Sequence, residues 1–234
     1  MQPTFLPWIG YFDLIDQVDD FVFLNDVQFS KQSWQQRNRI ATPRGLEWVT
    51  LPVESGPLDR MINEVKISLG VNSVVSKIEN NYKKYPYFSR YWPEIKLILL
   101  NFSRGDYLSS LNIDLIKSIS LMLGINSRFT LSSSLECSID KIQRLIDINS
   151  QLNSTKYLSP IGSMDYLLNH IKTFNEKYIE VKFHNYSHPN YQINGLPFYL
   201  GASVIDLLFS CGDEAIQIIR SGREDPFLHQ GVKI

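Results

Sequence analysis

Cysteine is scarce in this sequence of 234 residues, and its two cysteines, Cys137 and Cys211, lie far apart without any Cys-x-x-Cys spacing. A disulfide framework or a zinc knuckle needs more cysteines at closer spacing, so the sequence argues against both. Such sparse use of cysteine is typical of a reducing compartment. We therefore expect a cytoplasmic protein.

An excess of charge and a long apolar run are also missing. Lys+Arg is 23 and Asp+Glu is 24, so the formal net charge of −1 creates no overall field that attracts nucleic acid or an anionic membrane. No apolar run reaches the roughly 20 residues of a membrane span, and the apolar N-terminal segment lacks the basic region of a signal peptide. We expect no membrane insertion, while the composition leaves the oligomeric state open.

Enough apolar sequence is present for a substantial core, because 44% of the residues are hydrophobic and 12% are aromatic. Apolar positions three or four apart predict helices, and short β-branched or aromatic runs predict strands. The helices are expected at 9–18, in two or three pieces between 71 and 101 with breaks at Pro86 and Pro93, at 108–122, from 139, at 164–174 and at 203–211. The strands are expected at 21–24, 128–131, 157–158 and 179–183, with a hairpin at 37–53 that turns at 42–45.

Alternation of strands and helices favours an α/β fold with a mostly parallel sheet of the Rossmann-like type. We expect a single domain over residues 1–234, with the hairpin and a helical insertion at about 71–124. Ligands bind such sheets at the carboxyl ends of the strands, which places residues 25–26, 159–163 and 184–192 on the functional edge. A strand is also expected before the first helix, but only residues 1–5 are available. Met1 is therefore expected to be an internal methionine of a longer chain, or the chain to be truncated.

The densest group of polar and aromatic side chains lies at residues 25–40. Lysine and arginine suit phosphate or carboxylate, and a tryptophan offers a stacking face for a sugar or base. This composition fits a phosphorylated or nucleotide-linked ligand, and it equally fits an exposed hairpin with solvated charges. The candidate residues are Asp26, Gln28, Lys31, Trp34, Gln35, Arg37, Asn38 and Arg39.

Residues 157–167, with the sequence YLSPIGSMDYL, place a Ser-Pro-x-Gly-Ser turn between a strand and a helix. Free backbone amides at a helix start bind anions, so Ser159, Gly162 and Ser163 are candidates for a phosphate site. Ser163 is also expected to cap the following helix.

The loop that follows the strand at 179–183 carries His184, Tyr186, His188, Tyr191 and Gln192. A histidine titrates near neutral pH and can act as a general base. Two histidines without a nearby acidic partner are a poor metal site, so no metal is predicted.

Further along, Ser203 and Asp206 fit the [ST]-x-x-[DE] capping box. Cys211 fits apolar packing. Common nucleophile, P-loop, dinucleotide and zinc-protease motifs are not present in the sequence.

These segments, taken in order, resemble the WbqC-like family of bacterial proteins. The resemblance rests on QPTFLPWIGYFDLI at 2–15, DVQF-x-K-x-x-W-x-x-RN-x-I at 26–40, LPV at 51–53, YLSPIGSMDYL at 157–167, HPNYQ at 188–192 and SVIDLLFSCG at 203–212. It implies a place among genes for O-antigen and other surface polysaccharides, and a suggested glycine transfer to an amino sugar.

The opening segment also resembles the H-x-G-H signature of nucleotidyltransferases. Trp8, Ile9, Gly10 and Tyr11 occupy the corresponding positions, so Gly10 is retained and both histidines are absent. This departure favours phosphate binding without nucleotidyl transfer.

The resemblance and the residues together predict an enzyme that transfers an amino acid or acyl group to an amino sugar carried on a nucleotide. Asp26 or His188 is the expected base. Lys31, Arg37 and the turn at Gly162 and Ser163 are expected to hold phosphate, and Trp8, Trp34 and Tyr191 to stack on sugar or base. The remaining substrate-binding candidates are Gln2, Gly10, Tyr11, Gln28, Asn38, Ser159 and Gln192.

The partner is expected to be a nucleotide sugar. ATP or another nucleotide is the candidate co-substrate, and a charged tRNA is the alternative donor. Two other functions stay open: a nucleotidyltransferase-like enzyme that uses ATP or CTP, and a non-catalytic sugar-nucleotide-binding protein.

Overall fold

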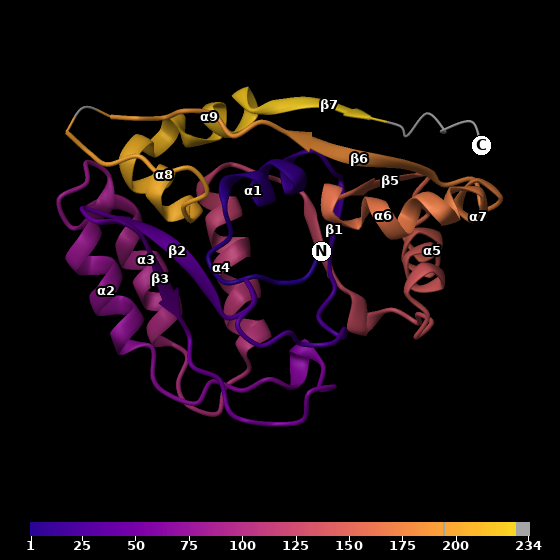
Figure 1. The fold of residues 1–234 in the computed structure, drawn as a ribbon, viewed down its shortest axis with the longest axis horizontal. Helices are drawn as coiled ribbons and strands as arrows, with labels where there is room; N and C mark the ends of the chain where they lie inside the picture. The colour runs from indigo at the N-terminus through magenta and orange to yellow at the C-terminus, as the bar shows by residue number, and fades with distance from the viewer. Residues whose placement is uncertain (194, 228–234) are drawn as a thin grey trace.

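The structure is a computed structural model that describes residues 1–193 and 195–227. A parallel pair of short strands, β1 (Asp20–Phe23) and β4 (Arg128–Leu131), lies near the middle of the molecule (Figure 1). Helix α1 (Ile9–Asp16) precedes β1, and α4 (Leu108–Met122) precedes β4. Phe21, Phe23 and Phe129 pack against one another across the pair, with ring centroids 5.2–6.0 Å apart. Aromatic cross-strand contacts thus hold together strands too short to be stable alone.

The predicted hairpin is confirmed. Strands β2 (Arg37–Thr42) and β3 (Gly45–Thr50) pair antiparallel, and Gly45 takes the positive φ of 118° that closes the turn. Because side chains alternate along β2, Asn38 and Ile40 are buried while Arg37 and Arg39 point to the opposite face. Helix α2 (Asn72–Tyr82) packs against both strands of the hairpin.

Helix α3 (Phe88–Leu100) packs against α4, and its course corrects one prediction. Pro86 separates α2 from α3 as expected, but Pro93 lies inside α3 and is exposed. The helix continues because its apolar side, which includes Tyr91, Trp92 and Ile95, is buried in the core.

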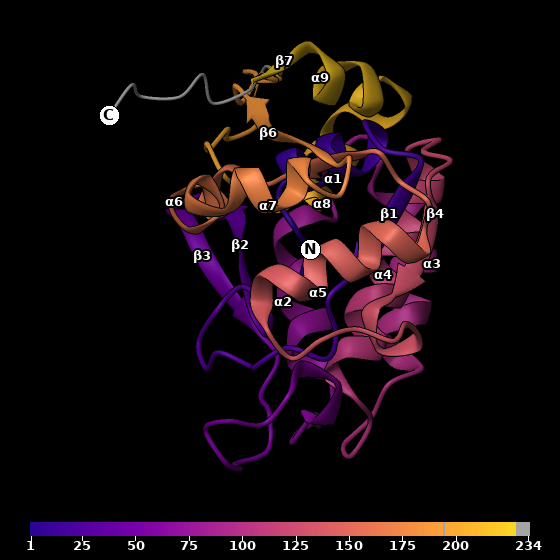
Figure 2. The same ribbon diagram turned by 90° about the vertical axis from the view of Figure 1, so that its right-hand side faces the viewer.

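The C-terminal part has a sheet of its own, which runs along the top in Figure 1. Strands β5 (Lys156–Ser159) and β6 (Glu180–Tyr186) are parallel, and the edge strand β7 (Arg223–Phe227) pairs antiparallel with β6. Helices α5 (Lys141–Gln151), α6 (Met164–Leu167) and α7 (Ile171–Asn175) accompany this sheet, as Figure 2 shows from the side. Their apolar side chains form a small second core around Phe174 and Phe183.

Two predicted helices differ from the observed ones in this region. The helix expected from Ile139 begins at Lys141, because Asp140 accepts hydrogen bonds from the backbone amides of Ile142 and Gln143 and leaves Ile139 exposed. The helix expected over 164–174 is divided by a short 3₁₀ turn between α6 and α7. The apolar residues of segment 164–174 nevertheless keep their helical spacing, because the apolar side of both α6 and α7 packs against the second core.

The chain then returns to the large core through α8 (Val204–Cys211), which was predicted, and α9 (Ala215–Ser221), which was not. Five 3₁₀ turns are described in addition: η1 (Ile62–Glu64), η2 (Ser132–Ser134), η3 (Ile161–Ser163), η4 (Leu168–His170) and η5 (Gly212–Glu214). No helix in the described part of the chain combines the length and apolar character needed to cross a bilayer.

The α/β class is therefore confirmed, but a single Rossmann-like sheet is not. Strands of the described residues form three separate small sheets, two of which contain a parallel pair. The hairpin, α2, α3 and α4 all come between β1 and β4, and most of their apolar residues belong to the large core. The buried apolar residues of the three helices at 71–124, the segment expected as a helical insertion, belong to this core.

Candidate functional site

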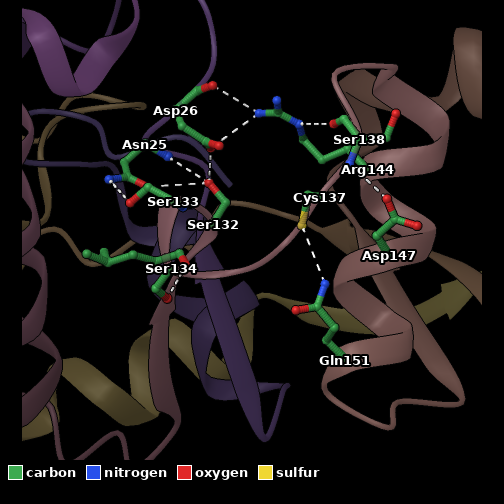
Figure 3. Close-up of polar contacts among 11 residues, drawn as sticks. Asn25, Asp26, Ser132, Ser133, Ser134, Cys137, Ser138, Arg144, Asp147 and Gln151 are labelled. Carbon is green, nitrogen blue, oxygen red and sulfur yellow. Dashed lines mark hydrogen bonds and ion pairs between the residues drawn. The ribbon is translucent and has the colours of Figure 1, made fainter.

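The parallel pair β1–β4 ends in a polar cluster, as expected for the carboxyl ends of such strands (Figure 3). Asn25 and Asp26 follow β1, and Ser132 and Ser133 follow β4. The Ser132 hydroxyl donates a hydrogen bond to the Asp26 carboxylate, and the Asn25 side-chain amide donates to Ser133 Oγ at 2.9 Å. These contacts tie the ends of the two strands together.

Arg144 on α5 reaches this cluster from the C-terminal part of the chain. Its Nη1 lies 3.2 Å from Asp26 Oδ1 and donates to the Asp26 backbone carbonyl at 3.0 Å. The Arg144 and Asp26 side chains are only 12% and 25% exposed, so this ion pair is largely shielded from water. One oxygen of the Asp26 carboxylate thus faces a serine and an arginine at once, which is an arrangement for holding two parts of the fold together.

The N-terminal segment QPTFLPW, which precedes α1, is irregular, and internal hydrogen bonds hold it in place. Met1 lies beside β1, because its carbonyl accepts from the Leu24 amide at 2.8 Å. Gln2 is joined to the hairpin region, where the Gln35 amide donates to Gln2 Oε1 at 2.9 Å. The Tyr11 hydroxyl is also occupied, since it donates to the Gln2 carbonyl at 3.0 Å, and Tyr11 is buried.

The buried side-chain amides of two asparagines also hold the N-terminal segment in place. The Asn38 amide donates to the carbonyls of Phe5 and Leu6 at 3.1 and 2.7 Å, and Asn112 donates to the carbonyl of Pro3 at 3.2 Å. Leu6 has a φ of 43°, a left-handed conformation that costs a leucine free energy unless neighbours hold it. The position of Asn38 on the inner side of β2 thus shapes the opening segment.

Gly10 has a steric reason to be glycine. A Cβ at this position would lie 2.3 Å from Cη2 of the Trp8 indole, so a side chain here collides with the ring. The close backbone approach anticipated for a ligand is therefore made by Trp8, which lies over Gly10 and stays 38% exposed.

The hairpin and the turn that precedes it carry four side chains that we call the Arg–Trp face: Trp34 on the turn, Arg37 and Arg39 on β2, and Trp48 on β3. The Cζ of Arg37 lies 4.2 Å from the centre of the Trp48 ring, and that of Arg39 lies 5.6 and 5.8 Å from the Trp34 and Trp48 rings. The two indoles are 5.3 Å apart and are 47% and 42% exposed. Two cations thus stack on two accessible aromatic rings.

No acidic partner balances these two arginines within the described residues. Neither guanidinium makes an ion pair or a hydrogen bond there, and the Nε atoms of both are buried without a hydrogen-bond partner. Buried polar groups normally have partners, and arginine offers several donors. The Arg–Trp face is therefore a positively charged surface with unused hydrogen-bond donors.

His188 lies beside this face, next to Gly201. A Cβ on Gly201 would lie 3.1 Å from Arg39 Nη2, and the Gly201 amide donates to His188 Nε2 at 3.4 Å. The imidazole stacks between Trp8 and Tyr191, with ring centroids 6.1 and 5.9 Å away. Trp8, His188 and Tyr191, all predicted from the sequence, thus meet at one end of the Arg–Trp face.

The protonation state of His188 follows from its contacts. Burial lowers its pKa below the usual 6.5, so the ring is neutral at pH 7. The Nδ1–H donates to the Pro189 carbonyl at 2.9 Å, which leaves the Nε2 lone pair as the acceptor that faces Gly201. A neutral imidazole whose Nε2 lone pair accepts one long hydrogen bond, at 3.4 Å from the Gly201 amide, has the chemistry of a base.

Asp206 lies behind Tyr191 and departs from its expected capping role. The Ser203 hydroxyl does accept from the Ile205 amide, but the Asp206 carboxylate accepts hydrogen bonds from Tyr82 and Tyr191, both at 3.0 Å. The side chain is 1% exposed, and burial raises its pKa to about 6 against the hydrogen bonds from the two tyrosines. Asp206 thus fixes the position of Tyr191, whose ring stacks on His188.

The Ser-Pro-x-Gly-Ser turn follows β5 as expected, but its contacts are internal. The Ser163 side chain accepts no capping hydrogen bond from the helix; its hydroxyl donates to the Pro160 carbonyl at 2.6 Å and contacts the Ser159 hydroxyl, and its backbone amide donates to the same carbonyl. The predicted cap is wrong because η3 turns the Ser163 side chain back toward Ser159. Gly162 is exposed.

The remaining candidates lie apart from the Arg–Trp face in their contacts. Gln28 donates to the Leu58 carbonyl at 3.0 Å, and Lys31 is exposed on a turn. Gln192, next to Tyr191, lines a hollow of about 430 Å³ together with residues of α8 and α9. A second hollow of about 680 Å³ lies between the hairpin turn and α2. Lys31 and Gln192 have the exposure that a ligand contact needs.

Sequence patterns predicted Trp34 and Arg37 as ligand contacts. They missed Trp48 and its pairing with Arg39 across the hairpin. Register places Arg39 directly opposite Trp48 across the hairpin. The signal was present, because residues with i, i+2 spacing share one side of a strand and a known turn fixes their cross-strand partners. Arg144 carried no such signal, since it is 118 residues from Asp26.

Comparison with known proteins gives two matches. The model of the WbqC-like protein family matches residues 2–218 of this chain. An uncharacterized protein of Mycobacterium tuberculosis, Rv1507c, is 33% identical over 229 residues, which cover 96% of this chain and 97% of the relative. No solved structure matches the chain significantly.

Proposed function

The chain belongs to the WbqC-like protein family, and from that premise we propose that it is an enzyme of bacterial surface-polysaccharide (O-antigen) biosynthesis. The proposed reaction transfers an amino acid or acyl group, with glycine as the first candidate, to an amino sugar carried on a nucleotide. The Arg–Trp face is the observation that carries this proposal. Its two arginines lack acidic partners within the described residues, and they lie against exposed indoles beside a neutral histidine.

Each part of a nucleotide-linked amino sugar has a counterpart in this arrangement. Guanidinium groups suit phosphate oxygens, and exposed indoles suit the flat face of a base or the apolar face of a sugar. Trp34 and Trp48 therefore serve as stacking surfaces, and Arg37 and Arg39 as the phosphate ligands. The amino group of the sugar belongs near His188, where Trp8 forms a further wall.

Acyl transfer to an amine needs a base, because an alkylamine is protonated at neutral pH. His188 is better suited than Asp26, since it is neutral and adjoins the Arg–Trp face through Gly201. Asp26 is engaged by Ser132 and Arg144. In the proposed step His188 Nε2 accepts the proton of the sugar ammonium, and the amine then attacks the carbonyl carbon of an activated aminoacyl ester or anhydride. The new amide bond forms as the bond between the carbonyl carbon and the leaving oxygen breaks. The nitrogen then loses a second proton, which ends on the leaving oxygen.

Mass spectrometry of reaction mixtures tests the proposal. The purified protein is mixed with nucleotide-linked amino sugars and glycine, together with either ATP or charged tRNA as the source of activation. We expect a product heavier by one glycyl group, and we expect His188→Ala to abolish it while Asp26→Asn retains at least part of it, provided that the variant stays folded. Absence of acylated product across a broad panel of sugars and donors would count against transfer.

A second function, sugar-nucleotide binding without catalysis, is favoured by one observation. His188 Nε2 already faces the Gly201 amide, and the Asp26 carboxylate already faces Arg144, so both candidate bases are engaged in the fold. If the protein only binds, His188→Ala leaves polysaccharide output in cells unchanged, whereas Trp34→Ala abolishes ligand binding. If it catalyses transfer, both variants lose polysaccharide output.

A further inference from the structure

The arrangement of the two arginines suggests which phosphate group the protein recognises. Arg37 and Arg39 are separated by one residue on β2, so both side chains leave the same side of the strand about 7 Å apart at Cα. Trp48 lies directly opposite Arg39 on β3 and also stacks on Arg37. A single indole therefore helps to position both guanidinium groups.

The stacking also restricts which nitrogen atoms a ligand can reach. The Nε atoms of Arg37 and Arg39 are buried, while each side chain as a whole keeps intermediate exposure. The terminal Nη groups are consequently the accessible donors. Each guanidinium can hold one phosphate through two parallel hydrogen bonds.

The two adjacent guanidinium groups of Arg37 and Arg39 match a ligand with two adjacent phosphates better than a ligand with a single phosphate. A diphosphate bridge presents two negatively charged phosphoryl groups in sequence, so each arginine can take one of them and both positive charges are neutralised. A monophosphate can occupy only one fork fully and leaves the other arginine without a partner. Leaving a charged donor unpaired in a partly buried site costs free energy.

We propose that Arg37 and Arg39 form a diphosphate subsite and that the ligand is a nucleoside diphosphate sugar, not a nucleoside monophosphate sugar. This inference rests on the proposed function and names its substrate class. The base stacks on the exposed indole of Trp34, which keeps 47% of its surface accessible. The sugar points from Arg39 toward Gly201 and His188, because Gly201 is the neighbour of the Arg39 Nη2 atom.

Isothermal titration calorimetry with the purified chain tests this assignment. The probes are the nucleoside, its monophosphate and its diphosphate for each common base. For the preferred base we expect the diphosphate to bind at least tenfold more tightly than the monophosphate. Equal affinity of the two phosphates, or no binding of any diphosphate, would overturn the subsite.

Variants locate the binding to this face. Arg39→Leu is expected to weaken diphosphate binding at least tenfold, and Arg39→Lys to restore only part of it, because an ammonium lacks the planar fork. Arg44→Leu, in the turn of the same hairpin, is the matched control and should bind like the wild-type chain. Circular dichroism and the melting temperature establish that each variant is folded. An Arg39→Leu variant that is folded and binds diphosphate normally would refute the assignment.

These outcomes separate the subsite from the reaction. Tight diphosphate binding that depends on Arg39, without any acylated product, supports the subsite and counts against transfer. Acylated product from a monophosphate sugar, with no preference for diphosphate, supports transfer and overturns the subsite.

Discussion

Asp206→Asn should change how the stability of the protein depends on pH. The Asp206 carboxylate is 1% exposed, and burial raises its pKa from 3.8 to about 6. An acid whose pKa is higher in the folded state binds its proton more tightly there, so folding gains stability as the pH falls below about 6. Above that pH the folded chain bears the full cost of a buried charge.

The expected size follows from the shift. At about 1.4 kcal/mol for each pH unit, the cost of ionising Asp206 reaches about 3 kcal/mol at pH 7. Between pH 5 and pH 7 the wild-type chain should lose about 1.3 kcal/mol of unfolding free energy relative to Asp206→Asn, because asparagine does not titrate. The amide of the variant also differs from a neutral carboxyl group in its contacts with Tyr82 and Tyr191, which adds a constant difference that does not depend on pH. The charge-dependent strength of these hydrogen bonds is already contained in the pKa of about 6.

Urea denaturation of both chains at pH 5, 6 and 7 measures this slope. Asp213→Asn is the control, because the exposed Asp213 carboxylate bonds to Arg90, which lowers the pKa of Asp213. The stability that Asp213 contributes is lost only as the pH falls through that lowered pKa, so this control should follow the wild type between pH 5 and 7. Parallel wild-type and Asp206→Asn curves, or a wild-type chain that gains relative stability as the pH rises, would refute the reasoning.

Two other substitutions probe contacts that only the fold creates. Arg144→Ala should lower the unfolding free energy by about 2 kcal/mol, because it leaves the shielded Asp26 carboxylate without its cation, as urea denaturation will measure. Arg90→Ala removes the ion pair with Asp213, which is exposed on both sides, and should cause no measurable change, so equal losses in both variants would contradict the role of burial. Gly10→Ala should displace the Trp8 indole, alter tryptophan fluorescence and cost about 1–3 kcal/mol of stability. Gly70→Ala meets no atom within 4 Å and is its control; identical spectra for Gly10→Ala and the wild type would show that Trp8 does not depend on Gly10.

Local patterns in the sequence predicted several elements well. The apolar positions of 108–122, closed by a glycine, became α4, and the strand at 128–131 appeared with the same bounds as β4. The turn residues at 42–45 located the hairpin. These features depend on neighbours a few residues apart, so their information is contained in short stretches of sequence.

Other elements depend on contacts that short stretches do not contain. Strand β7 carries a proline, which is unfavourable in a central strand and is tolerated here because β7 is an edge strand. The alternation of strands and helices suggested one mostly parallel sheet, whereas the strands divide among three. Which strands pair is decided by how the helices pack, and periodicity within one segment does not report it.

The candidate site shows the same division. By itself the sequence determined that aromatic and cationic residues are concentrated at 25–40 and that histidines and tyrosines gather at 184–192. Only the tertiary structure decided that Arg39 lies beside Gly201 and His188, that Asp26 is held by Arg144, and that Asp206 bonds to two tyrosines instead of capping its helix. The reason is physical: composition and spacing fix which groups are available locally, whereas burial and partners more than 100 residues away fix their charge state and orientation.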